Sequence, residues 1–393
     1  MLALLGALIA VGPLSIDMYL PAFPAVEAAL GVSQGSAEFT LAAFFIGITL
    51  GQAAYGPLSD RFGRRKPLLA GLALYTFASV GCALAGSLHA LAAWRFLQAL
   101  GGCAGMVITR AVVRDRCGAR EAARAFSMLI LVMGLAPILA PLAGGWVSTA
   151  LGWRAIFGVL TLFGLGAFVT VLLKLEESHD TRHEPPLRLG KVLRDYAGLM
   201  ANRTFVGFVL AGGLAMAGMF AYIAGSPFVL MELYGIPPEH YGWYFGSNAL
   251  GFVAASQVNA LLLKRHPPTG LLRNALGVPA IAGVALALLA ALGWLPMPLL
   301  LAAFFTYIAS LGFLVPNSTA AALATHGQQA GTASALLGTA QFALATLMGT
   351  LVGMVHDGSA RPLAFIMAAC GVSAWLAYRL LIVPLEKRGH ILH

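Results

Sequence analysis

Charged residues are scarce in this sequence of 393 residues. Asp, Glu, Lys and Arg together make up only 10% of it, whereas 59% is hydrophobic and the mean hydropathy is +0.84. A soluble domain carries about 25% charged residues, so this chain cannot cover itself with a surface that suits water. The composition therefore predicts a protein embedded in a lipid bilayer.

Cysteine is also scarce, and several common motifs are missing. The four cysteines form no CxxC pair, which argues against both a disulfide framework and a metal site. No phosphate-binding loop is present, so ATP is not the expected energy source, and nothing in the sequence calls for a cofactor. We also find no catalytic dyad or metal cluster of the kind that an intramembrane enzyme would need.

Long hydrophobic segments are what the chain has instead. A bilayer core about 30 Å thick needs about 20 apolar residues per helix. The first such segment lacks a basic start and contains Asp17, so we interpret it as a helix and not as a cleavable signal peptide. The predicted fold class is an all-α polytopic membrane protein with two bundles of six helices. The twelve predicted spans lie near 2–24, 38–59, 67–88, 89–112, 124–150, 153–174, 203–230, 240–263, 270–293, 296–320, 329–354 and 361–384.

The basic residues are placed asymmetrically. All but three of the 24 Lys and Arg residues lie in alternate connections or near the C-terminal end. The positive-inside rule then puts these connections and both termini in the cytoplasm. The net charge of +9 is therefore a topology signal and does not indicate nucleic acid as a partner.

The longest polar stretch predicts how the chain is divided. It covers residues 176–200, includes an amphipathic segment at 187–196, and separates two six-helix halves at 1–175 and 201–393. Two repeated bundles around a charged linker are typical of secondary transporters. Direct sequence similarity between the halves is weak.

The connection between the second and third spans, residues 56–66, reads GPLSDRFGRRK. Gly56 is expected to allow close approach of helices, and Gly63 to supply the backbone conformation of a tight turn. Asp60 ends the second span and is suited to the positive N-terminus of another helix. This segment resembles the loop motif of the major facilitator superfamily almost position for position.

The resemblance implies a cytoplasmic latch that holds the two halves together in the outward-open state. In that latch Asp60 would face the eleventh helix near Ala330, and Arg64 would pair with Asp115 at the end of the fourth helix. A plain basic loop is the alternative, but it does not explain the order of the residues. The expected latch residues are Gly56, Asp60, Arg61, Gly63, Arg64 and Asp115.

Three further segments resemble the drug:proton antiporters of this superfamily. Residues 95–101 (RFLQALG) match the arginine motif of the fourth helix, and residues 134–145 (GLAPILAPLAGG) resemble the antiporter motif of the fifth. The alanine form of that motif, with SIDMYLPAFP at 15–24, is similar to the bicyclomycin/chloramphenicol-resistance (Bcr/CflA) branch.

This branch implies a monomeric protein of the bacterial inner membrane that exports small drug-like molecules in exchange for protons. The proline and glycine residues of the fifth helix would bend it and seal its periplasmic end against leak. These residues are Gly134, Pro137, Pro141, Gly144 and Gly145.

Asp17 and Arg95 are the charged residues placed deep within the predicted spans. Asp17 would lie roughly 24 Å from the cytoplasmic start of its helix, and Arg95 roughly 10 Å from the outer end of its own. Because such charges are costly, we predict a proton-coupling site in which Asp17 takes a proton from the periplasm and releases it when drug binds. A permanent ion pair and the absence of any contact are the alternatives. Pro21 and Pro24 either kink the first helix or end it.

Aromatic and amide residues in the spans predict a mostly apolar cavity, which suits varied amphipathic molecules better than one hydrophilic sugar. For each amide, a hydrogen bond between helices is the more common role. The main alternative function with the same fold is transport of one specific metabolite, symport included, and a sensor that transports nothing is another. The candidate substrate-binding residues are Tyr19, Phe45, Tyr222, Asn248, Tyr307, Asn317 and Gln341.

Overall fold

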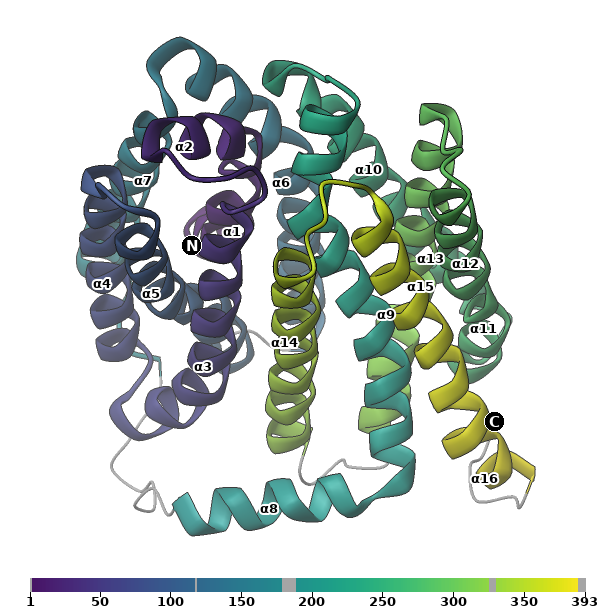
Figure 1. Cartoon of the computed structure of the whole chain (residues 1–393). Coiled ribbons are helices and arrows are strands. Elements are labelled where there is room, and N and C mark those ends of the chain that lie inside the picture. The colour runs from purple at the N-terminus through teal and green to yellow at the C-terminus, as the bar shows by residue number, and fades with distance from the viewer. Residues whose placement is uncertain (1, 117–118, 179–188, 325–329, 388–393) are drawn as a thin grey trace. The chain divides into compact units, whose positions relative to one another are not determined.

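The computed structural model describes residues 2–116, 119–178, 189–324 and 330–387, which form helices with short connections and no strand (Figure 1). The chain divides into two compact units. Unit 1 contains Met1–Leu187 and Gly235–Gly246, and unit 2 contains Arg188–Tyr234 and Ser247–His393. One boundary between the units lies inside the polar stretch at 176–200, and two more enclose residues 235–246, which the predicted division had placed in the second half.

In the part of the chain that the structure describes, unit 1 is built from seven whole helices, one 3-10 turn and the first part of a further helix, α10 (Pro238–Leu262). In chain order they are α1 (Leu2–Asp17), the 3-10 turn η1 (Leu20–Ala22), α2 (Phe23–Leu30), α3 (Glu38–Phe62), α4 (Arg65–Leu84), α5 (Leu88–Arg116), α6 (Ala119–Leu151) and α7 (Trp153–Lys174).

Unit 2 begins with a helix, α8, that covers most of the predicted amphipathic segment and contacts α9 and α14. Asn202 caps α9, because its side-chain oxygen accepts the N–H groups of Thr204 and Phe205. The helix α10 (Pro238–Leu262) begins in unit 1 and ends in unit 2. The other elements are α8 (Leu189–Ala201), α9 (Arg203–Pro227), the π-helical segment η2 (Phe228–Leu233), α11 (Pro268–Ala275), α12 (Gly277–Ala291), α13 (Met297–Ala324), α14 (Ala330–Met354), α15 (Arg361–Ala377), the π-helical segment η4 (Tyr378–Ile382) and α16 (Val383–Lys387).

The described helices match the predicted spans. Eleven segments are long and apolar enough to cross a membrane. The remaining predicted span is α10, a helix of 25 residues that is interrupted by polar side chains such as Asn248, Gln257 and Asn259. The all-α membrane fold predicted from hydropathy is therefore confirmed.

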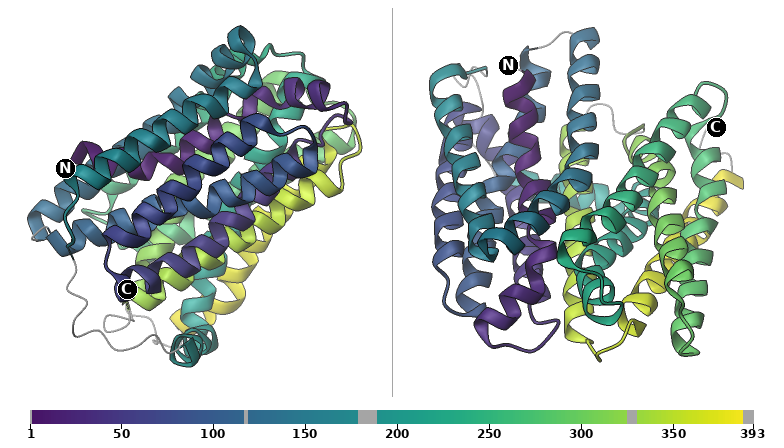
Figure 2. Two further views of the ribbon diagram at one scale, coloured as in Figure 1. Left: turned by 90° about the vertical axis from the view of Figure 1, so that its left-hand side faces the viewer. Right: turned by 90° about the horizontal axis from the view of Figure 1, so that it is seen from above.

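The two units repeat one packing pattern. In unit 1, α5 packs on α1, α3 and α4, while α1 contacts α6 and α7, and α4 contacts α7 (Figure 2). In unit 2, α13 packs on α9 and α12, while α9 contacts α14 and α15, and α12 contacts α15. Gly312 of α13 also lies against the backbone of α10 at Phe252 and Ser256, as α5 lies against α3. The same helix pairs recur in the same chain order, which is the internal repeat that the weak sequence similarity does not reveal.

The first membrane segment is broken directly after Asp17, where α1 ends. Pro21 and Pro24 stand in the first turns of η1 and α2, positions where proline costs no helical hydrogen bond. Of the two interpretations of these prolines, the structure shows a break followed by a new helix. Gly144 of α6 lies against the carbonyl group of Met18 inside this break, so closely that a Cβ atom at position 144 would overlap it.

Candidate functional site

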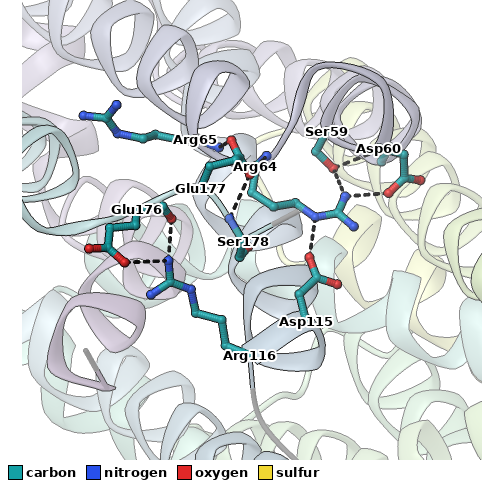
Figure 3. Close-up of polar contacts among 10 residues, drawn as sticks. Ser59, Asp60, Arg64, Arg65, Asp115, Arg116, Glu176, Glu177 and Ser178 are labelled. Carbon is teal, nitrogen blue, oxygen red and sulfur yellow. Dashed lines mark hydrogen bonds and ion pairs between the residues drawn. The ribbon is translucent and has the colours of Figure 1, made fainter. Parts of the chain in front are cut away.

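Arg64, which immediately precedes α4, is the centre of a polar network at one end of unit 1 (Figure 3). Its Nε donates to Asp115 Oδ2 at 2.7 Å, and its Nη1 donates to Asp60 Oδ1 at 2.5 Å and to Ser59 Oγ at 2.9 Å. The Arg64 side chain is only 3% exposed. Burial opposes its charge, but the hydrogen bonds to Asp115 and Asp60 outweigh burial and raise the pKa of Arg64 above its usual value. We call Ser59, Asp60, Arg64, Asp115 and Glu177 the loop network.

Glu177, just after α7, caps the start of α4. Its Oε1 accepts the backbone N–H of Arg64 at 2.7 Å, and its Oε2 accepts the backbone N–H of Arg65 at 3.0 Å (Figure 3). The first N–H groups of a helix lack partners within it, and the helix dipole favours a negative charge there. Sequence reasoning missed this role, and the only signal for it was an acidic residue at the point where the polar stretch begins.

We expect Glu177→Ala to lower the free energy of unfolding by up to about 1 kcal/mol, because α4 loses its cap. Thermal unfolding of the purified protein in detergent measures this change. Glu176→Ala is the matched control: the Glu176 side chain is 91% exposed, so its ion pair with Arg116 at 3.9 Å contributes little, and the hydrogen bond from Arg116 to the Glu176 backbone carbonyl stays. Equal melting temperatures for the two variants would contradict the capping role.

The two motif glycines differ in their surroundings. Gly63 has φ +83°, and the Glu177 carboxylate occupies the space that a Cβ atom would need. The tight turn predicted at Gly63 is therefore present. A Cβ atom at Gly56 would meet nothing within 4 Å, so the close helix approach predicted there is not found among the described residues. Arg61 is exposed. The contact predicted between Asp60 and the start of α14 would join the two units, and it stays a prediction.

Arg95 of α5 is completely buried in an aromatic cage. Its guanidinium carbon lies 4.1 Å from the ring centre of Phe44, 4.7 Å from that of Tyr19 and 5.8 Å from that of Phe157. Such faces attract a cation. Nη1 donates to Gln98 Oε1 at 2.6 Å, whereas Nε and Nη2 have no hydrogen-bond partner in the described part of the chain. Two donor nitrogens of this buried cation thus have no hydrogen-bond acceptor among the described residues.

Asp17 is 3% exposed at the end of α1 and makes no ion pair or hydrogen bond with any residue that the structure describes. The pairing of Asp17 with Arg95 that we considered from the sequence is not seen. The physical reason is local: the chain turns after Asp17 and presents the ring of Tyr19 to Arg95. Both charges are buried in unit 1, as predicted, but each lacks an ionic partner there.

The antiporter-motif residues lie along the uninterrupted helix α6, with Pro137 and Pro141 inside it. Gly144 packs on the break after Asp17, as described above. Its neighbour Gly145 lies against the backbone of Pro238 and Glu239, at the start of α10 within unit 1. The end of the motif thus packs against the segment that carries Asp17. Gly134 lies near the middle of α6.

The candidate substrate residues are all buried, and several make hydrogen bonds between helices. Asn248 Nδ2 donates to the Tyr222 hydroxyl at 2.8 Å, and Asn317 Nδ2 donates to Asn259 Oδ1 at 2.7 Å. The Tyr307 hydroxyl donates to the carbonyl of Ala215. In unit 1, Tyr19 belongs to the Arg95 cage and Phe45 is fully buried on α3; in unit 2, Gln341 is buried on α14.

Two acidic residues that sequence reasoning did not single out are also buried in unit 1. Glu27 lies on α2 and Glu38 begins α3. The first span was predicted to end at residue 24, which left Glu27 in a loop, whereas α2 continues to Leu30. Extending the helix through Pro24 would have revealed this acid.

These features define a polytopic helical membrane protein with charges buried inside one of two repeated bundles. The sequence model described as "Major Facilitator Superfamily" matches residues 5–350. The chain belongs to this family, which makes it a multi-pass bacterial membrane transport protein rather than an enzyme.

The chain is similar to several curated bacterial proteins. An "uncharacterized MFS-type transporter YdgK" of Bacillus subtilis is 34% identical, over 95% of this chain and 93% of that protein. A "bicyclomycin resistance protein homolog" of Haemophilus influenzae is 32% identical, over 98% and 97%. "Multidrug resistance protein MdtL" of Escherichia coli is 29% identical, over 94% and 92%. The predicted resemblance to the Bcr/CflA branch is thereby confirmed.

Solved structures share the fold at low sequence identity. The xylose transporter XylE from E. coli matches with a TM-score of 0.72 and 17% identity, over 97% of this chain and 95% of that one. A bacterial homolog of the human lysosomal transporter Spinster matches with a TM-score of 0.75 and 16% identity, over 98% and 96%. At these identities the likeness concerns the fold alone.

Proposed function

We propose that this protein exports small amphipathic antibiotics across the bacterial inner membrane in exchange for protons, by alternating access. The observation that carries the proposal is Asp17, an acid buried at a helix break in unit 1 without an ionic partner among the described residues. A charge inside a membrane bundle is costly, and it is retained where it serves transport.

Asp17 and Arg95 supply the two opposing influences that a coupling acid needs. Burial favours the neutral carboxyl group of Asp17, whereas a nearby cation would favour the carboxylate. Arg95 has two donor nitrogens without an acceptor among the described residues, so it could donate hydrogen bonds to a carboxylate when the surrounding helices shift. In the proposed cycle, Asp17 binds a proton from the periplasm as drug leaves and releases it to the cytoplasm as drug binds.

The loop network and α6 supply the conformational parts of the proposal. Asp60, Arg61, Arg64 and Asp115 would form the cytoplasmic latch, because Arg64 already joins the end of α3 to the end of α5. The packing of Gly144 on the break after Asp17 would couple movement of α6 to the protonation of that acid. Both termini are placed in the cytoplasm on the distribution of Lys and Arg.

Drug-like substrates are supported by two observations. The relatives from H. influenzae and E. coli are named for resistance to bicyclomycin and to multiple drugs. The candidate substrate residues are mainly aromatic and amide side chains, which suit amphipathic molecules. Among the described residues, we find no cluster of charged side chains that would select one hydrophilic metabolite.

The proposal is tested with the protein reconstituted in liposomes that hold a pH-sensitive dye. A panel of chloramphenicol-like, bicyclomycin-like and cationic dye compounds is added, and lumenal pH is followed. We expect at least one compound to drive proton movement that empty liposomes lack. If no compound does so while a metabolite moves, the protein is a metabolite transporter and the proposal is wrong.

A further inference from the structure

Two acidic side chains, apart from Asp17, are buried at the end of unit 1 opposite the loop network. Glu38 is the first residue of α3, whereas Arg64 lies two residues after the last residue of the same helix. Glu38 is 1% exposed, and Glu27 on the neighbouring α2 is 5% exposed. Neither residue belongs to the site assigned above. We call Glu27 and Glu38 the carboxylate pair.

The two members of the pair differ in their hydrogen bonds. Glu27 Oε1 accepts the backbone N–H of Ala37 at 2.8 Å, next to Glu38 in the chain. Glu38 Oε2 is buried and receives no hydrogen bond from any described residue. The two carboxyl groups are close enough to interact electrostatically.

These contacts point to one bound proton. Two carboxylates that are close together and shielded from water cannot both carry a charge at low cost. A backbone N–H stabilises the charge on Glu27, whereas the bare oxygen of Glu38 has nothing to stabilise a charge. A divalent cation is a poorer occupant, because calcium takes six to eight oxygen ligands and two carboxyl groups supply too few. The proton therefore belongs to the pair, with Glu38 as its main holder.

Tyr19 connects the carboxylate pair to the Arg95 cage. Its ring lies under the Arg95 guanidinium, and it interacts electrostatically with both Arg95 and Glu27. Its hydroxyl group shares a hydrogen bond of 2.9 Å with Thr40 Oγ1, which in turn donates to the carbonyl of Ala37 at 2.7 Å. Tyr19 is thus the single residue through which a change of charge at the carboxylate pair would reach Arg95.

The other ionisable groups on the neighbouring helices have their own contacts. His89, on α5, lies with its ring centre 6.0 Å from that of Phe39, the residue after Glu38. Arg154, on α7, stacks on Trp153 and donates to the carbonyl of Ala85 at 3.0 Å. Glu27 acts electrostatically on Glu38, and Tyr19 interacts with both Glu27 and Arg95.

We propose that the carboxylate pair is a second protonation site, which exchanges a proton with the water at this end of unit 1 and acts on the Arg95 cage through Tyr19. The step is a proton transfer between water and a Glu38 carboxylate oxygen, and no other bond changes. The link to transport rests on the proposed function, but the protonation itself does not.

Infrared difference spectroscopy tests the protonation directly. The purified protein in detergent is titrated with acid and base, and the carbonyl band of protonated carboxylic acids is followed. We expect one component of this band, present near neutral pH, to be lost in Glu38→Gln and kept in Asp17→Asn. Glu38→Gln is nearly isosteric, and its elution and melting temperature show whether it is folded. If a folded Glu38→Gln keeps the whole band, the site assignment is wrong.

A second measurement tests the exchange. In liposomes, drug-driven proton flux is measured while the pH is varied on the side that faces the Glu38 end of unit 1. We expect this flux to depend less on that pH in Glu38→Gln than in the wild type, while drug still binds. If the band is lost but the pH dependence equals that of the wild type, the proton is static and the exchange is refuted. If wild type moves no protons with drug, the proposed function fails, while the infrared result still decides the protonation site.

Discussion

Asp17→Asn is expected to reduce drug-driven proton movement to the level of empty liposomes. The amide has nearly the same shape as the carboxyl group but can neither bind nor release a proton. Asp17 is buried at the break between α1 and η1, and Gly144 of α6 lies against the Met18 carbonyl group in that break, so the proposed function couples the protonation of Asp17 to α6. Lumenal pH after addition of drug measures the effect, and binding of drug to the folded variant is expected to persist.

The matched control for this experiment is an acid outside the membrane segments. Asp357 is exposed in the connection before α15, and the hydrogen bonds from Ser359 lower its pKa below the usual value. It is therefore ionised throughout the assay, and Asp357→Asn is expected to transport like the wild type. If Asp17→Asn also keeps its coupling, Asp17 is a structural residue, and Glu38 becomes the first candidate for the proton carrier.

The second large effect is expected for Arg64→Ala, which removes the centre of the loop network. The side chain of Arg64 is buried, and it pairs with Asp115, whose side chain is also mostly buried. Removing one partner of a buried ion pair leaves the other charge uncompensated and costs roughly 3 kcal/mol or more. We expect a clearly lowered melting temperature in detergent and a loss of transport in liposomes.

Two further variants separate charge from geometry in this network. Arg64→Lys keeps the charge but loses the planar group that reaches Asp115 and Asp60 together, so an intermediate effect is expected. Asp60→Asn is expected to leave stability nearly unchanged, because Asp60 is 56% exposed and exposed ion pairs contribute little. If it nevertheless abolishes transport, Asp60 acts in the latch and not in folding. Normal stability and transport in Arg64→Ala would refute the role of the network.

Several local features could be predicted from the sequence because each depends on residues near one another in the chain. The turn at Gly63 follows from a glycine between an apolar helix and a basic run, and the structure has φ +83° there. The contact between Arg64 and Asp115 could be expected only through the resemblance to the superfamily, since 51 positions separate the two residues. Pro21 and Pro24 indicated a kink or an end of the first helix, and the structure has a break after Asp17.

The candidate site was predicted in part. The burial of Asp17 and Arg95 followed from their positions in apolar segments, but their partners did not. The cage of Arg95 draws Tyr19, Phe44 and Phe157 from three different segments, and their meeting depends on how each helix is rotated about its axis. Hydropathy carries no information on that rotation when residues on all sides of a helix are apolar.

The sequence by itself determined the long apolar segments, the all-α fold and the asymmetry of basic residues, because apolar length and charge are summed along the chain. Only the tertiary structure decided that Arg95 lies among aromatic rings instead of beside Asp17. It also decided that Glu177 caps a helix from over a hundred residues away in the chain, and that Glu27 and Glu38 are buried close enough to interact electrostatically. The physical reason is that these contacts depend on helix packing, in which small residues such as Gly144 set how closely two backbones approach.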